Sequence, residues 1–210
     1  MNGFLDLFLH LDTTLGEAIA AYGGWMYAVM FLVVFCETGL VVTPFLPGDS
    51  LLFAAGAFAA AGALNPWIVA GLLLAAAVLG DAVNYRIGRK IGMRAENGKL
   101  LGLPIRKEYI EKTKRYYEKY GAKTIVLARF MPIVRTFAPF VAGVGAMPYA
   151  TFARYNVVGA ALWVGLFTFA GYFFGNIPVV KANFEFVILA IIAVSLTPPV
   201  IEYLRERKKG

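Results

Sequence analysis

The sequence has little charge. Of its 210 residues, 16% are Asp, Glu, Lys or Arg and 60% are hydrophobic. A soluble domain carries about a quarter charged residues, so this composition argues against an ordinary soluble domain, and also against a disordered chain. Cys36 is the one cysteine, so no intramolecular disulfide can form, and His10 is the one histidine. We therefore expect no metal site, no Ser/His/Asp catalytic set and no cofactor, and the absence of a Walker loop argues against ATP.

Basic residues are missing from the first 85 positions, where the formal charge is −6. Residues 86–123 carry +8 and residues 124–210 carry +5, which gives the net charge of +7. This distribution is typical of a polytopic membrane protein, whose Lys and Arg stay in the cytoplasm. We expect an external N-terminus, a cytoplasmic loop at 86–123 and a cytoplasmic C-terminus. The net charge then needs no nucleic-acid partner.

The apolar runs predict an all-α polytopic membrane protein, with residues 1–210 forming a single membrane domain. Segments 66–85 and 148–174 are long enough to span a bilayer, and each starts at a proline. A final span is expected near 184–203, followed by a cytoplasmic basic tail at 204–210. The total is about three full spans.

Two segments have the helical period of amphipathic helices that lie in the membrane interface, one at 4–22 and one at 106–120. The second is basic and would rest on an anionic cytoplasmic leaflet. A solvated helix in a cytoplasmic loop is the alternative interpretation of that segment.

Two further regions each contain two short apolar arms around a proline-containing break. The arms at 24–36 and 50–63 flank the first break, and the arms at 125–128 and 141–147 flank the second. Each arm is shorter than the roughly 20 residues that a spanning helix needs. We interpret both regions as re-entrant helical hairpins, which are tolerated at membrane depth only where protein or water shields the backbone.

The two halves of the chain share the same order of parts, which predicts a repeat at about 4–88 and another at about 106–175. The matching features are Tyr22-Gly23 and Tyr120-Gly121, Phe45-Leu46-Pro47 and Phe130-Met131-Pro132, Pro66 and Pro148, and Tyr85 to Gly88 and Tyr172 to Gly175. The charge distribution places the hairpins on opposite faces, so the repeat is inverted. Inverted repeats with broken helices are a transporter architecture, with the substrate near the midplane.

Four charged side chains lie in or beside the hairpin breaks: Glu37, Asp49, Arg129 and Arg135. A charge at bilayer depth costs ~2.5–3.5 kcal/mol, so the four must pair or line a hydrated cavity. We expect the two acids to pair with the two arginines. The pairs are either a structural lock between the hairpins or a substrate site. In the second case the guanidinium forks bind phosphate, and the acids respond to protonation.

Four other polar residues are secondary candidates. Asp81 and Tyr85 lie late in the 66–85 span, and Arg154 and Asn156 lie early in the 148–174 span. An interfacial acid that pairs with neighbouring basic residues is an equally good interpretation of Asp81.

Three segments together resemble one known family. They are FCETGLVVTPFLPGDSLLF at 35–53, GDAVNYRIG at 80–88 and ARFMPIVRTFAPFVAG at 128–143. The chain is similar over nearly its whole length to the DedA family of bacterial inner-membrane proteins, which shares a superfamily with the scramblases that carry the VTT (SNARE-associated) domain. The resemblance implies transport of undecaprenyl phosphate from the outer to the inner leaflet, dependent on the proton-motive force. It assigns the family's functional acids to Glu37 and Asp49, and its functional arginines to Arg129 and Arg135.

Other functions remain compatible with the sequence: a phospholipid flippase or scramblase, a proton-coupled exporter of small molecules, or an assembly factor without transport. An anion carrier needs the arginine pair, whereas a cation exporter would bind its substrate through the acids. Anionic lipid, membrane lipids and protons are the expected partners. The small residues Gly159, Ala160, Ala161 and Gly165 could pack helices within or between chains, so a homo-oligomer is compatible with the sequence.

Overall fold

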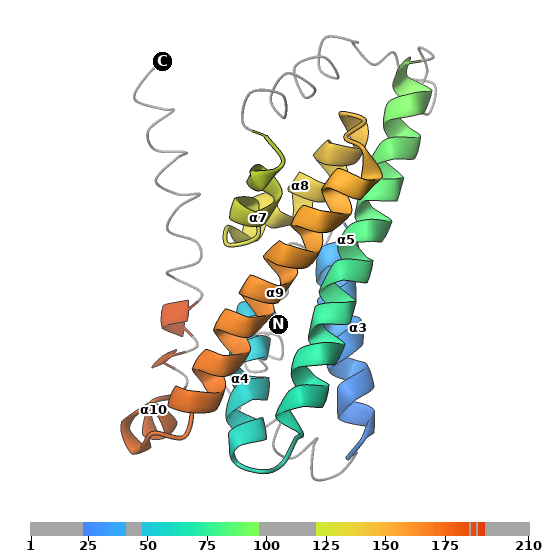
Figure 1. Cartoon of the computed structure of the whole chain (residues 1–210). Coiled ribbons are helices and arrows are strands. Elements are labelled where there is room, and N and C mark those ends of the chain that lie inside the picture. The colour runs from blue at the N-terminus through green and yellow to red at the C-terminus, as the bar shows by residue number, and fades with distance from the viewer. Residues whose placement is uncertain (1–22, 41–47, 97–120, 185, 188, 192–210) are drawn as a thin grey trace, which may run out of the picture. The chain divides into compact units, whose positions relative to one another are not determined.

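The structure is a computed structural model that describes residues 23–40, 48–96, 121–184, 186–187 and 189–191, and the regular elements in these ranges are helices (Figure 1). They are α3 (Trp25–Gly39), α4 (Gly48–Ala60), α5 (Pro66–Glu96), α7 (Lys123–Ala128), α8 (Pro132–Val144), α9 (Tyr149–Phe174) and α10 (Pro178–Ala182). The predicted interfacial helices 4–22 and 106–120, most of the span 184–203 and the tail 204–210 lie outside the described residues.

Among the residues that the structure describes, two helices are long and apolar enough to cross a membrane, namely residues 66–93 of α5 and the whole of α9. The start of α5 follows from local chemistry. The side-chain oxygen of Asn65 accepts hydrogen bonds from the backbone N–H groups of Trp67 and Ile68, at 3.0 and 3.2 Å. Asn65 is therefore the N-cap, and Pro66 occupies the first helical position, where its missing N–H costs nothing.

The other end of α5 differs from the prediction. The helix continues to Glu96, about three turns beyond the expected end near Tyr85. The added residues include Arg, Lys, Met and Ala, which are good helix formers. Hydrophobicity predicts the end of the span at the first charged residues, but these residues allow the α-helix to continue.

The second hairpin also differs from the prediction, because its second arm is a longer helix. Helix α8 begins at Pro132, where proline is favoured at the first helical turn, and not at Val141. The break between α7 and α8 therefore shrinks to residues 129–131. Pro139 lies inside α8 and costs that helix a hydrogen bond. Arg135 therefore lies on a helix, and Arg129 is the C-cap of α7. Glu37 also lies on a helix, because α3 continues to Gly39.

The chain divides into two compact units. The first contains the described residues 23–34, 48–76 and those after 161, and the second contains 35–40, 77–96 and 121–161. Each unit thus combines pieces of both predicted repeats. The repeat borders at 88 and 106 are not unit borders, and the inverted repeat itself stays a prediction.

In the first unit, α4 packs closely on the last part of α9. A Cβ built on Gly56 would overlap the backbone of Thr168, and one on Gly171 would overlap the carbonyl of Phe53. At the same end of α9, Trp67 of α5 makes an edge contact with Phe169, with ring centroids 6.2 Å apart. Glycine lets two helix backbones approach this closely, as at many helix interfaces in membranes.

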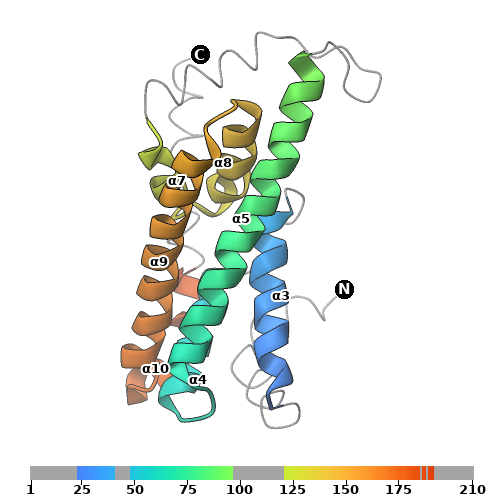
Figure 2. The ribbon, with the colours of Figure 1, turned by 45° about the vertical axis from the view of Figure 1, so that its right-hand side comes forward.

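In the second unit, α8 packs in the same way on the last part of α5, beside which it lies in Figure 2. A Cβ on Gly88 would overlap the carbonyl of Phe140, and one on Gly143 would overlap the carbonyl of Tyr85. The second arm of each predicted hairpin thus packs on the long helix of the other half of the sequence. Gly88 and Gly175 are the glycines of the two Tyr-x-x-Gly motifs, and Gly175 meets Ala57 of α4.

The two Tyr-Gly motifs also have a common backbone feature. Gly23 precedes α3 with φ of +50°, and Gly121 precedes α7 with φ of +73°. Both values lie in the left-handed region that glycine enters without steric cost. The shared conformation supports the equivalence of these two positions.

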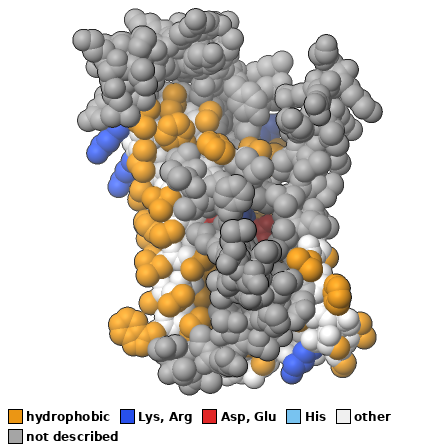
Figure 3. All heavy atoms as spheres, turned by 180° about the vertical axis from the view of Figure 1, so that it is seen from behind, with side chains coloured by type: hydrophobic (Ala, Val, Ile, Leu, Met, Phe, Trp, Pro, Cys, Tyr) orange, Lys and Arg blue, Asp and Glu red, His pale blue; other side chains and the backbone are white. Residues whose placement is uncertain are grey.

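Much of the described surface is apolar. On the face drawn in Figure 3, most described side chains are hydrophobic and few are charged. Large exposed side chains on α5 and α9 include Trp67 at 75%, Leu79 at 50%, Leu162 at 53% and Phe173 at 67% exposed. Two long helices with this exposed surface fit a lipid environment, in which apolar side chains need no protein cover.

The glycine contacts predict a sharp contrast between positions. We expect Gly88→Ala and Gly171→Ala each to destabilise the fold by about 1–3 kcal/mol, because the added methyl group meets backbone that cannot move aside. Gly71→Ala and Gly165→Ala are matched controls, since nothing lies within 4 Å of a Cβ at either position. They should be neutral or stabilise by up to about 1 kcal/mol. Thermal unfolding in detergent micelles measures the difference, and equal melting of all four variants would contradict the packing.

Candidate functional site

The described part of the second unit contains two buried ion pairs. Arg135 on α8 donates to the carboxylate of Glu37 on α3, and Arg129 at the end of α7 donates to the carboxylate of Asp81 on α5. The four side chains belong to residues that are only 1–7% exposed. Their formal charges sum to zero. Each arginine thus meets a carboxylate that offsets much of its desolvation cost.

Asn156 on α9 extends the pair formed by Arg129 and Asp81. Its side-chain oxygen accepts a hydrogen bond from the Arg129 guanidinium at 2.5 Å, and its amide nitrogen donates to the carbonyl of Val78 at 3.1 Å. One amide therefore fixes the orientation of the guanidinium and joins α9 to α5. Asn156 is 1% exposed, so these bonds are shielded from water.

Asn84 on α5 organises the pair formed by Arg135 and Glu37. Its amide nitrogen donates to the carbonyls of Thr38 and Thr136, at 3.0 and 2.7 Å. These carbonyls belong to the residues that directly follow Glu37 and Arg135. The side chain of Asn84 thus holds the two backbones that carry the ion pair. Asn84 is fully buried, so the bonds face no competition from water.

Two glycines bring the helices close enough for these contacts. A Cβ on Gly80 of α5 would overlap the hydroxyl of Thr38, and one on Gly159 of α9 would lie 3.2 Å from Cα of Val126 in α7. The first contact brings the end of α3 onto α5 beside Asn84. The second brings α7 onto α9 beside Arg129. Small residues therefore allow the charged side chains to reach one another.

Asp49 lies in the first unit, in the first turn of α4, and is 7% exposed. Its carboxylate accepts a hydrogen bond from the indole Nε1–H of Trp163 at 2.8 Å. Trp163 on α9 is fully buried, so the bond is shielded from water. The hydrogen bond holds the carboxylate of Asp49 in one orientation against α9.

The four secondary candidates have different surroundings in the structure. Tyr85 is buried in an aromatic cluster, where it stacks on Phe152 with ring centroids 4.5 Å apart and donates its hydroxyl hydrogen to the carbonyl of Met147. It therefore helps to pack α5 against α9. Arg154 is exposed and does not belong to the buried ion pairs described above. Asp81 and Asn156, in contrast, belong to the pair that Arg129 forms.

The sequence predicts that Glu37 and Asp49 pair with the two arginines without saying which acid meets which arginine, and in the structure Glu37 pairs with Arg135. The carboxylate that pairs with Arg129 is that of Asp81. The sequence indicates Asp81 only as a secondary site candidate, and an interfacial acid paired with neighbouring basic residues is an equally good interpretation of it. The pairing of Asp49 with an arginine stays a prediction, as does substrate binding by any of these residues. Within the described parts of the chain, no three His, Cys, Asp or Glu side chains form a group that could hold a metal ion.

Sequence reasoning missed Asn84 and Trp163. Asn84 could have been found, because it is an amide inside an apolar span and lies three residues after Asp81, on the same helix face. Trp163 gave no such signal. A tryptophan in an apolar helix fits any packed position, and only the three-dimensional contact shows its role.

We expect Asn84→Leu, which keeps the volume but removes the amide, to destabilise the protein by about 2–3 kcal/mol, because the buried carbonyls of Thr38 and Thr136 lose their donor. Asn183→Leu is the control, since Asn183 is exposed and bonds only within its own turn. Its effect should stay within about 0.5 kcal/mol. Thermal unfolding in micelles measures both changes, and a loss at Asn84 no larger than at Asn183 would refute the role of the amide.

Comparisons with known proteins identify the family to which the chain belongs. Residues 46–173 match the VTT domain family. The chain is 56% identical over 209 residues to Protein DedA of Escherichia coli (strain K12), which covers 97% of this chain and 94% of that protein. It is 40% identical over 193 residues to an uncharacterized membrane protein of Mycobacterium tuberculosis (strain H37Rv), covering 90% of this chain and 83% of that one.

Inner membrane protein YghB of Escherichia coli (strain K12) is 36% identical over 159 residues, 75% of this chain and 72% of that protein. Its name supports a place in the bacterial inner membrane for this chain. No solved structure matches. With the VTT domain over more than half of its length and high identity over almost all of it, the chain belongs to the DedA family of VTT-domain membrane proteins.

Proposed function

We propose that this protein is a lipid transporter that moves undecaprenyl phosphate from the outer to the inner leaflet of the cytoplasmic membrane, where the carrier re-enters cell-envelope synthesis. The observation that carries the proposal is the pair of buried arginines, Arg129 and Arg135, each bonded to one carboxylate. The family of membrane proteins to which the chain belongs is consistent with a transporter.

The chemistry of the site supports an anionic substrate. A guanidinium presents a planar fork of donors that fits a phosphate as well as it fits a carboxylate. A phosphate that enters can therefore replace Glu37 on Arg135, or Asp81 on Arg129, without any arginine being left unpaired. Glu37, Asp81 and Arg135 lie on helices, and Arg129 caps the end of α7. Such rigid positions favour a site whose geometry is set before the substrate binds.

Such an exchange leaves a carboxylate without its arginine, and a proton can neutralise it. In the resting state Arg135 and Glu37 form a neutral pair. With substrate bound, Arg135 holds the phosphate and the external proton resides on the Glu37 carboxyl group, so the buried charge is again balanced. The membrane potential and pH gradient would then bias transport through this proton. We propose that Asp49, whose carboxylate accepts a hydrogen bond from Trp163, also responds to protonation.

The same contacts weigh against a cation exporter. A cationic substrate would bind the acids, yet Glu37 and Asp81 already accept from buried arginines and Asp49 accepts from an indole. At Glu37 or Asp81 a cation would have to expel a guanidinium and leave it buried and unpaired, which costs several kcal/mol. Phospholipids, which also carry a phosphate, are the remaining alternative substrate class.

We expect Arg129→Ala and Arg135→Ala each to weaken binding of undecaprenyl phosphate at least about tenfold, because each removes charge-assisted hydrogen bonds to phosphate. Binding is measured with the purified full chain in phosphatidylcholine nanodiscs. Arg154→Ala is the matched control, since Arg154 is exposed, and it should bind like the unmodified protein.

A neutral double variant, Glu37→Gln with Arg135→Gln, separates binding from folding. Removal of both charges leaves no uncompensated ion, so this variant should melt closer to the unmodified protein than Arg135→Gln alone. It should nevertheless fail to bind. Full binding by both alanine variants would refute the phosphate role, and equal binding of phosphatidylglycerol would favour phospholipid transport.

We expect an acidic exterior to accelerate movement of undecaprenyl phosphate into the inner leaflet of proteoliposomes, by up to about tenfold per pH unit. Glu37→Gln mimics a permanently neutral acid, so its rate should lose most of this dependence. The measurement is the initial rate of lipid movement with and without the gradient. If the initial rate of the unmodified protein is the same with and without the gradient, proton coupling is ruled out, whereas the proposed binding site is not affected.

A further inference from the structure

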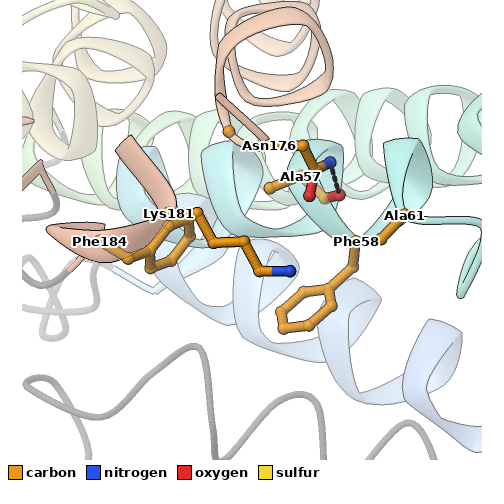
Figure 4. A pocket seen from close by; sticks show the side chains of 7 residues that line it. Ala57, Phe58, Ala61, Asn176, Lys181 and Phe184 are labelled. Carbon is orange, nitrogen blue, oxygen red and sulfur yellow. Dashed lines mark hydrogen bonds between the residues drawn. The ribbon is translucent and has the colours of Figure 1, made fainter. Parts of the chain in front are cut away.

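The first unit contains a cavity of about 210 Å³ where α4, α9 and α10 end. Its lining residues are Ala57, Phe58, Ala61, Gly175, Asn176, Lys181 and Phe184, of which five are apolar and one is charged (Figure 4). The cavity takes no part in the ion pairs of the second unit. It therefore needs an explanation of its own.

The inner wall of the cavity is well packed and apolar. Phe184 is 7% exposed and contacts the ring of Phe53, with centroids 5.9 Å apart. Gly175 packs against Ala57, where a Cβ would not fit, and the amide of Asn176 donates to the Ala57 carbonyl at 2.9 Å. Because these contacts fix the wall, the cavity is a feature of the folded unit, and its apolar surface suits a hydrocarbon chain.

Lys181 brings a positive charge to this apolar wall. It lies in the last turn of α10, is exposed, and extends toward Phe58 across the cavity in Figure 4. No other Lys or Arg occurs in the sequence between Arg154 and Arg205. An apolar cavity with one ammonium group at its mouth complements a molecule with an anionic head and a hydrocarbon chain.

The topology predicted from the charges places this cavity on the external side. Trp67 at the start of α5 contacts Phe169 near the end of α9, and Arg86, Arg89 and Lys90 lie near the other end of α5. The start of α5 is thus its end without basic residues, which faces outward by the positive-inside rule. A lysine on that side runs against the rule, so a functional reason for it is expected.

We propose that this cavity is a loading site for the transported lipid: Lys181 binds the phosphate, and the first part of the single hydrocarbon chain occupies the cavity. This inference rests on the proposed function and adds the place where the substrate is received. Pockets that enclose whole drug-sized ligands measure roughly 300–1,000 Å³. A cavity of about 210 Å³ is smaller than these and suits a segment of one chain. A single exposed ammonium also releases its phosphate readily, as transfer requires.

Native mass spectrometry of the full chain, titrated with undecaprenyl phosphate, tests the proposal by counting bound lipids. We expect two lipids on the unmodified protein, one that depends on Arg129 and Arg135 and a weaker one that depends on Lys181. Lys181→Gln should weaken the second lipid about tenfold. Ala61→Phe should do the same by filling the cavity from an exposed position, and Lys181→Arg should largely restore it. Lys90→Gln is the matched control and should change nothing.

The outcomes separate the two proposals. Unchanged binding of both lipids in Lys181→Gln and Ala61→Phe overturns the loading site, and the proposed function stands if the arginine variants still lose one lipid. A lipid that depends on Lys181 while neither arginine matters supports the cavity and refutes the arginine site. Phosphatidylglycerol provides the last comparison. If it fills the Lys181 site as tightly as undecaprenyl phosphate does, the assignment to a single-chain lipid is wrong.

Discussion

Two arginine side chains cannot be buried in this protein unless a carboxylate meets each of them. Burial of a single guanidinium costs several kcal/mol, and a bonded acid offsets much of that cost. Arg129 and Arg135 therefore determine where α3, α5, α7 and α8 must come together, since their partners Asp81 and Glu37 lie on helices that are distant in the sequence. The close contacts of glycines around them are the means by which this requirement is met.

Helix α5 provides the common surface for both ion pairs. Val78, Asp81 and Asn84 follow one another at intervals of three residues, and each bonds to a different part of the unit. The carbonyl of Val78 holds Asn156, Asp81 holds Arg129, and Asn84 holds the backbones beside the other pair. One face of one helix thus positions both arginines. Substitution of an ion pair by a hydrophobic set of equal volume is often compatible with stability, so packing alone does not require charge at these positions.

Much of this arrangement could be predicted from the sequence. The four charges at Glu37, Asp49, Arg129 and Arg135 stand out in an apolar chain, and the prolines at 66 and 148 indicate where the long helices start. Charge balance alone indicates that buried acids pair with the two arginines, but not which acid meets which arginine. These features are local or compositional, and they require no knowledge of which helices touch.

The remaining features depend on tertiary contacts. Asp81 and Asp49 are equally plausible partners for Arg129 on the basis of charge, and only the position of α5 beside α7 selects Asp81. The length of α5 was underestimated because charge ends a hydrophobic run but does not end a helix. The start of α8 was placed too late because Pro139 looks like a helix breaker, although one lost hydrogen bond is tolerated there.

The reciprocal packing of α4 on α9 and of α8 on α5 has a consequence for biogenesis. Helix α4 leaves the ribosome roughly a hundred residues before its partner α9. The face of α4 that contains Gly56 therefore has no packing partner until α9 has been synthesised. Neither half of the polypeptide can complete its own packing, because each supplies the helix that the other lacks. Assembly is therefore expected to finish only after synthesis of α9, and a chain truncated before α9 would leave α4 without its partner and exposed to proteolytic quality control.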